Sequence, residues 1–102
     1  MATYTVSAGH NSVGPWTMTA STVDTVTFTD NVASVQVCND GTVDVYVRTD
    51  GTNPTVPSAG ASSAAFRIPG GAVLEVEMRG QTDSVKLISS GTPTVSVQRS
   101  DT

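Results

Sequence analysis

Two short stretches of alternating residues constrain the fold of this chain more than any other feature. The segment from Ser34 to Thr49 carries valines that alternate with polar residues, at positions Val35, Val37, Val43, Val45 and Val47. A period of two is typical of strands with one buried face and one wet face. Asn39-Asp40-Gly41 separates the two stretches and is a turn signal, so the segment predicts a β-hairpin.

Side-chain parity selects the register of this predicted hairpin. A two-residue loop would place valines opposite polar residues on both faces, whereas the three-residue loop 39–41 sets Val37 opposite Val43 and Val35 opposite Val45. We therefore expect the longer loop, with Gly41 in the left-handed conformation that its missing Cβ permits. One outward face would then carry Ser34, Gln36, Asp44, Tyr46 and Arg48.

The rest of the chain also favours an all-β fold. Only 14% of its residues are charged, and Val and Thr, which fit a pleated surface, dominate. Other strand-like stretches lie at Tyr4–Ser7, Val23–Thr29, Ala65–Ile68, Ala72–Met78, Ser84–Ile88 and Thr94–Arg99, and within 72–78 we expect Leu74, Val76 and Met78 to point inward. Seven to eight short strands at such regular spacing predict an antiparallel β-sandwich or a small barrel.

The length of 102 residues predicts a single domain, 1–102. Residues 1–22 are weakly patterned and are interpreted as an N-terminal arm with a possible edge strand. Residues 23–102 would form the β-sandwich, interrupted by a long loop at 51–63 that is rich in Pro and small residues. Loops of this length in compact domains are usually functional or flexible.

The charge pattern excludes some classes of partner. The net charge is −4, and the five cationic side chains are scattered singly along the chain. Nucleic-acid binding needs clustered Lys and Arg, so we expect neither nucleic acid nor an anionic membrane as a partner. No apolar run approaches the ~20 residues of a membrane helix, and the N-terminus does not resemble a signal peptide, which predicts synthesis in a cytoplasm.

No residue pattern points to catalysis or to a cofactor. His10, the only histidine, lies in a Gly/Asn-rich segment with no nucleophile motif, and Cys38 has no neighbouring base or cation in the sequence. One His and one Cys do not make a zinc site. Pro69-Gly70-Gly71 lacks the lysine and helix start of a phosphate-binding loop. We therefore expect a protein that is not an enzyme and has no cofactor or metal.

Two acidic groupings leave alternatives open. Glu75 and Glu77 would lie about 7 Å apart on one strand face, within the range of paired glycosidase carboxylates, but an exposed strand face or a guarded sheet edge is the simpler interpretation. A second grouping has oxygen ligands suited to calcium but matches no Ca²⁺ loop, and turn chemistry explains it as well: Asp40, Asp44, Asp50 and Asn53.

Three segments carry a resemblance to a known class of proteins: Asn39–Asp50, Pro69–Gly71 and Ser84–Arg99. They resemble small virion proteins of tailed bacteriophages, especially phages that infect actinobacteria. In such phages, Thr/Val/Gly-rich β-sandwiches of this size decorate the capsid or cap small openings of the virion. The resemblance supplies no functional residues.

The resemblance implies a capsid decoration protein that stabilises the shell. Its partner would be the major capsid protein lattice, it would be a homo-oligomer with a trimer favoured over a dimer, and it would be located in the virion after synthesis in the host cytoplasm. Many copies on a lattice gain avidity, so each contact can be weak. The alternatives are a tail or head–tail position in the virion, or a glycan-binding module. We expect the contacts at the arm and the long loop, with four interface anchors: Trp16, Pro54, Val56 and Phe66.

Overall fold

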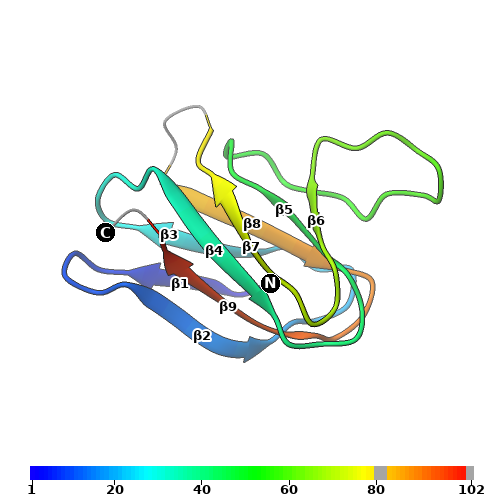
Figure 1. Ribbon diagram of the computed structural model, residues 1–102, viewed down its shortest axis with the longest axis horizontal. Helices are drawn as coiled ribbons and strands as arrows, with labels where there is room; N and C mark the ends of the chain where they lie inside the picture. The colour runs from blue at the N-terminus through cyan, green and yellow to red at the C-terminus, as the bar shows by residue number, and fades with distance from the viewer. Residues whose placement is uncertain (80–82, 101–102) are drawn as a thin grey trace.

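The computed structural model describes residues 1–79 and 83–100, which form nine strands in two packed sheets (Figure 1). The five-stranded sheet has the order β1-β3-β8-β5-β6 and the four-stranded sheet the order β2-β9-β4-β7. The strands are β1 (Thr3–Val6), β2 (Ser12–Thr17), β3 (Asp24–Phe28), β4 (Ser34–Asn39), β5 (Val45–Arg48), β6 (Phe66–Ile68), β7 (Val73–Glu77), β8 (Ser84–Ser89) and β9 (Thr94–Arg99). The prediction of an all-β sandwich is confirmed, with sheets that stay open and do not close into a barrel.

The core lies between the two sheets and is built from alternate strand positions. Val35 and Val37 of β4 are fully buried, as are Val45 and Val47 of β5, in agreement with the predicted parity. Burial of each such side chain contributes about 1.5–3 kcal/mol. Among the described residues, no helix is long and apolar enough to cross a membrane.

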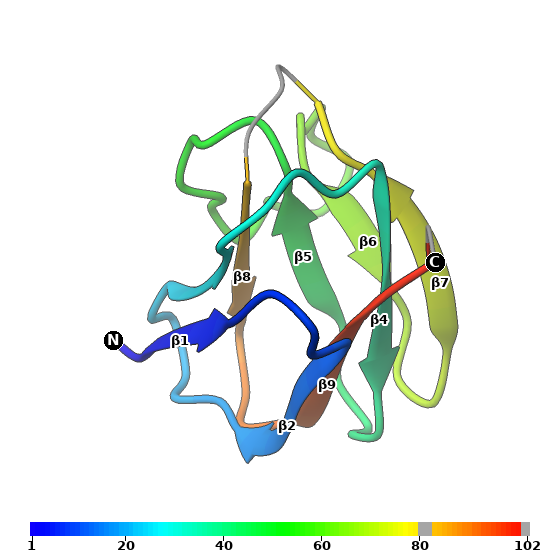
Figure 2. The same cartoon turned by 90° about the vertical axis from the view of Figure 1, so that its left-hand side faces the viewer.

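The predicted hairpin between β4 and β5 is wrong. The two strands lie in different sheets: β4 pairs with β7 and β9, while β5 pairs with β6 and β8 (Figure 2). The valines therefore face one another across the core instead of pairing side by side. The polar residues predicted to share one face lie on the outer faces of opposite sheets, Gln36 on one and Tyr46 on the other.

Asn39 makes this crossing between sheets possible. Its side chain is fully buried, and its Nδ2 donates hydrogen bonds to the carbonyls of Val43, at 2.8 Å, and Ile68, at 2.9 Å. Its Oδ1 accepts a hydrogen bond of 3.0 Å from the Gly41 N–H. The side chain thus replaces the backbone pairing that a hairpin turn would supply.

Gly41 is required for close packing and not for a left-handed backbone, contrary to expectation. Its φ is not positive, unlike those of Gly14, Gly51 and Gly60. A Cβ built on Gly41 would lie 2.4 Å from the Cβ of Pro93, nearer than real side-chain atoms approach. The crossing between sheets therefore packs directly against the turn between β8 and β9.

The first 22 residues supply an edge strand to each sheet. β1 pairs in parallel with β3, and β2, which the sequence analysis did not predict, pairs antiparallel with β9. The Gly14–Pro15 peptide bond is cis, and the register of β2 shifts between Val13 and Trp16. Proline in a sheet is confined to edges and bulges, and its position here fits that rule.

Candidate functional site

The connection from β5 to β6, residues 49–65, contains no strand or helix and projects beyond the sheets at the right of Figure 1. Most of its residues are exposed and small. Pro54 is buried, while Val56 and Pro57 are half-buried, so the middle of the loop is held against the body of the protein. We call residues 49–65 the projecting loop.

Ion pairing and hydrogen bonds fix the start of the projecting loop. Arg48 makes a bidentate ion pair with Asp50, whose Oδ1 also accepts a hydrogen bond from the Thr52 N–H at 3.1 Å. The hydrogen bond from Arg48 is the main reason that the pKa of Asp50 falls to about 2. Thr49, which is buried, donates from its hydroxyl to the Glu77 carbonyl at 2.7 Å.

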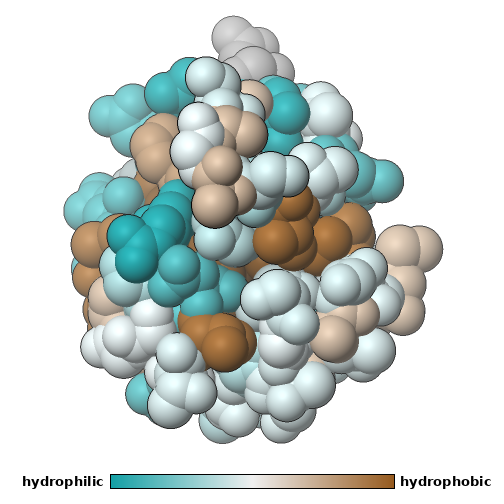
Figure 3. Space-filling view, turned by 90° about the vertical axis from the view of Figure 1, so that its right-hand side faces the viewer, coloured by the Kyte–Doolittle hydropathy of each residue, from teal (hydrophilic) through white to brown (hydrophobic). Residues whose placement is uncertain are grey.

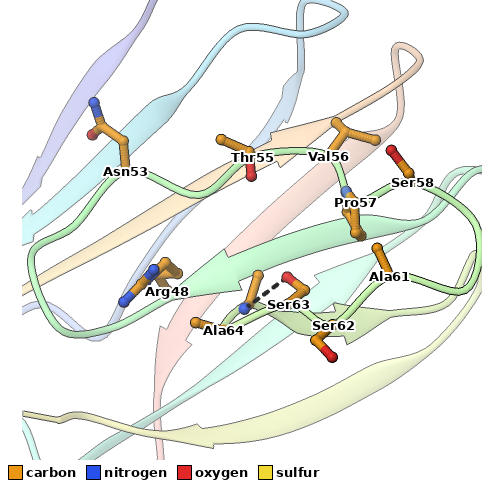
Figure 4. A pocket seen from close by; sticks show the side chains of 11 residues that line it. Arg48, Asn53, Thr55, Val56, Pro57, Ser58, Ala61, Ser62, Ser63 and Ala64 are labelled. Atoms are coloured by element: carbon orange, nitrogen blue, oxygen red, sulfur yellow. Dashed lines mark hydrogen bonds between the residues drawn. The ribbon is translucent and has the colours of Figure 1, made fainter.

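A hollow of about 410 Å³ lies between the projecting loop and Arg48 at the end of β5 (Figure 4). Its lining is mostly hydroxyl-bearing and small residues: Asn53, Thr55, Val56, Pro57, Ser58, Ala61, Ser62, Ser63, Ala64 and Ala65. Arg48 also lines it, but its charge is balanced by Asp50. The hollow therefore suits hydrogen bonding to neutral polar groups and lacks a nucleophile–base pair.

A second ion pair lies on β6, just after the projecting loop. Arg67 donates from Nε to Asp44 Oδ2 at 2.7 Å, and this bond is the main cause that lowers the pKa of Asp44 and raises that of Arg67. The Arg67 side chain is 61% exposed, so the pair contributes little to stability. Asp44 and Asp50, two of the four residues considered for calcium, are therefore each ion-paired with an arginine.

Three large hydrophobic side chains are exposed on the edge strands β6 and β7. Phe66 and Leu74 are each 42% exposed and Val73 is 54% exposed. Arg79 lies over the Phe66 ring, 5.3 Å from its centroid. The face at the right of Figure 1 correspondingly shows separate hydrophobic patches among polar residues (Figure 3).

The candidates for catalysis remain apart. His10 lies exposed between β1 and β2, Cys38 is half-buried on β4, and Glu75 and Glu77 are both exposed on β7. Glu75 accepts a hydrogen bond from the Ser34 hydroxyl at 3.1 Å. Within residues 1–79 and 83–100, no three acidic, His or Cys side chains converge to hold a metal ion.

The four predicted interface anchors do not lie on one surface. Trp16 is only 9% exposed; its Nε1 donates to Asp24 Oδ2 at 2.8 Å, and its ring lies 4.7 Å from that of Tyr4. It anchors the N-terminal strands, so it does not offer a stacking platform for a sugar. Pro54 and Val56 hold the projecting loop down, and Phe66 alone of the four is exposed. A role for these residues in partner contact stays a prediction.

Two features of this region were missed by the sequence analysis. The Arg48–Asp50 pair joins residues two apart across a strand end, a spacing that local inspection can suggest. The exposure of Leu74, predicted to point inward, follows from the position of β7 at a sheet edge. Its side chain lies on the inner face of the sheet, opposite Val37 in the register, but no neighbouring strand covers it at the open edge of β7. No sequence signal identifies an edge strand reliably.

Comparison with known proteins gives a match at the level of the fold. No family model and no curated protein matches the chain. PliG from Aeromonas hydrophila, a periplasmic inhibitor of g-type lysozyme, is similar over 94% of each chain, with a TM-score of 0.54 and 13% identity. A mutant of PliG from Escherichia coli, also a periplasmic inhibitor of g-type lysozyme, is similar over 95% of this chain and 96% of its own, with a TM-score of 0.44 and 16% identity.

These matches correct the expectations drawn from the virion resemblance. The solved structure that shares the fold at a TM-score of 0.54 is a periplasmic lysozyme inhibitor of Aeromonas hydrophila and not a virion protein. Four expectations are therefore wrong: a bacteriophage capsid decoration or tail protein, an oligomer whose partner is the capsid lattice, the alternative of a glycan-binding module, and a location in the virion. Alternation rich in Thr and Val is typical of any small β-sandwich, so those segments indicate the fold and not a relation to virion proteins. The matched Aeromonas hydrophila protein is an inhibitor of g-type lysozyme.

Proposed function

We propose that this protein is a non-catalytic inhibitor that binds a lysozyme, and that the projecting loop enters the substrate cleft of the enzyme. The observation that carries the proposal is the similarity to the Aeromonas hydrophila inhibitor over 94% of both chains. Since 13% identity speaks only for the fold, the proposal also rests on the shape and chemistry of the loop.

The shape of the projecting loop supports this role. A lysozyme cleft must admit a polysaccharide strand, so an effective blocking element is narrow and convex. The segment 58–63 consists of exposed Ser, Ala and Gly residues, whose small side chains let the backbone approach a cleft wall closely. Its hydroxyls offer hydrogen bonds to the polar groups that would otherwise bind sugar.

The anchoring of the loop also supports it. Binding a mobile loop loses affinity to conformational entropy, so an inhibitory loop works better when its shape is already fixed. Here the Arg48–Asp50 pair holds one end, Pro54 is buried in the middle, and the Ala65 N–H donates to Ser63 Oγ at 3.1 Å near the other end.

The test is the lysis of peptidoglycan by g-type lysozyme, followed as loss of turbidity with increasing amounts of this protein. We expect dose-dependent inhibition by the wild type. Ala59→Trp, in the exposed part of the loop, should weaken inhibition at least tenfold because the larger side chain blocks entry into the cleft. Ala20→Trp, at an alanine that is also exposed and lies between β2 and β3, is the matched control and should inhibit like the wild type.

The two parts of the proposal fail separately. If the wild type leaves lysis unchanged at tens of micromolar, the inhibitor function is wrong. If the wild type inhibits and Ala59→Trp inhibits equally well, the function stands but the projecting loop is not the contact.

A further inference from the structure

We propose that the free edge of β7 is a second docking site, which binds an extended segment of a protein partner in which apolar and cationic side chains alternate. The site is distinct from the projecting loop, and the proposal does not depend on lysozyme inhibition. Strand addition at a sheet edge takes its affinity from backbone hydrogen bonds and its specificity from alternating side chains.

The backbone of β7 presents bonding groups to its open side. β7 is the last strand of the four-stranded sheet and forms the right-hand border of the molecule in Figure 2. The Ala72 carbonyl accepts from the Asn39 N–H, and the Met78 N–H donates to the Ala33 carbonyl, so the even-numbered residues bond to β4. In an antiparallel pair the alternate residues point the other way, so Val73 and Glu75 direct N–H and C=O groups outward. Glu77 directs its N–H outward, while its C=O already accepts from the Thr49 hydroxyl.

The inner side of this edge would pack against apolar side chains of a partner. Leu74 on β7 and Phe66 on β6 both belong to the inner faces of their sheets, because they pair with the buried Val37 and Val47. Each is nevertheless 42% exposed, since neither sheet has a further strand to cover it. Inward side chains of an added strand would cover both.

The outer side of the edge favours cationic side chains of a partner. Glu75 and Glu77 are exposed, and their side chains leave the same face of the strand. An added strand would place its outward residues directly opposite them, where unlike charges stabilise and like charges destabilise pairing. Alternating Lys or Arg with Val, Ile or Leu satisfies both sides at once.

The same charges argue against a second copy of this chain. In an antiparallel dimer through β7, the symmetric register that pairs all of Val73–Glu77 sets Glu75 opposite its own copy and Glu77 opposite Val73. Two carboxylates would then face each other at the centre of the interface. The charges therefore select a basic partner over self-association.

The probes are two synthetic peptides of about seven residues, one alternating Lys with Val and one alternating Glu with Val, in line with usual strand lengths. Binding is followed on the ¹⁵N-labelled protein through backbone amide shifts and protection from hydrogen exchange. We expect the Lys/Val peptide to shift and protect the amides of Val73, Glu75 and Glu77, and to bind about tenfold more tightly than the Glu/Val peptide. Replacing Glu75 and Glu77 together by Lys should invert this preference.

A matched pair of variants isolates the backbone bond. Glu75→Gln removes one charge and keeps the N–H, while Glu75→Pro also removes a donor that β4 does not use, so the sheet itself keeps its ladder. Both variants are first checked for cooperative thermal unfolding. Glu75→Pro should then bind the Lys/Val peptide at least tenfold more weakly than Glu75→Gln.

Three results would overturn the proposal. The first is no amide shift along β7 at millimolar Lys/Val peptide, which would mean that the glutamates only prevent the edge from pairing with other strands. The second is equal binding of both peptides. The third is a concentration-dependent shift of the same amides without peptide, which would assign the edge to a dimer.

Discussion

Replacing Asn39 by alanine should remove a large part of the free energy of unfolding of this protein. The variant removes three hydrogen bonds at once: Nδ2 to the carbonyls of Val43 and Ile68, and the Gly41 N–H to Oδ1. Because Asn39 is fully buried, water does not readily replace the lost partners. Each buried polar group left without a partner costs about 1–3 kcal/mol.

The Ile68 carbonyl is the most deeply placed of the three partners, and the cavity left by the side chain adds to the loss. We expect a decrease of about 3 kcal/mol in the free energy of unfolding, a substantial part of the 5–15 kcal/mol typical of domains. For a chain of this length that lowers Tm by roughly 12–24 °C. Urea unfolding followed by circular dichroism and a thermal scan provide the two measurements.

Asn53→Ala is the matched control, since Asn53 is exposed on the projecting loop; it should change stability by less than about 0.5 kcal/mol. Asn39→Asp keeps an acceptor for Gly41 but sets a carboxylate beside two carbonyl oxygens, so it should cost at least as much as the alanine variant. If Asn39→Ala lowers the unfolding free energy by less than about 1 kcal/mol, the role given to this side chain in the crossing between sheets is wrong.

Three other predictions follow from the same contacts. Arg48→Gln should return the pKa of Asp50 from about 2 toward the ordinary ~3.9, as read from the carboxyl chemical shift in an NMR titration. Because the pKa in the folded protein is the lower one, the pair stabilises the fold fully above about pH 4 and this stabilisation is lost as pH falls toward 2. An unchanged pKa in the variant would refute the pairing. Trp16→Phe keeps the ring packing but removes the bond to the buried Asp24, and should cost about 1–3 kcal/mol in urea unfolding, whereas a neutral result would mean that the Ala2 N–H bond to Asp24 suffices. Gly41→Ala should destabilise by about 1–3 kcal/mol through its clash with Pro93, and the clash is absent if Tm stays within a degree or two of wild type.

The sequence predicted which residues are buried better than it predicted which strands pair. Alternation at Val35 and Val37, and again at Val45 and Val47, correctly assigns all four to the core. The same alternation is compatible with a hairpin or with a crossing between sheets, because parity is a property of one strand and pairing a property of two. The buried amide of Asn39 decides the matter, and in sequence it resembles an ordinary turn residue.

The segment 51–63, expected to be a long loop, lies in the connection between β5 and β6. Phe66 is exposed, and its role in partner contact stays a prediction. Trp16 was expected to anchor the N-terminal arm to the sandwich or to a neighbouring subunit, and in the structure its Nε1 donates to Asp24. Asp24 is the first residue of β3, and nothing local in the sequence indicates that its carboxylate is buried.

The two edges of the sandwich differ in a way that links the fold to both proposals. At the N-terminal edge, the ring of Trp16 on β2 packs at a tilt against that of Tyr4 on β1, and its Nε1 donates to Asp24 of β3. Aromatic side chains therefore bridge the two sheets at this edge. At the other edge, Phe66 and Leu74 stand at equivalent inner positions but remain 42% exposed. These two uncovered side chains are the apolar part of the docking site proposed for this edge. The projecting loop and the free side of β7 lie at this open edge, which makes it the part of the molecule where a partner has most to cover.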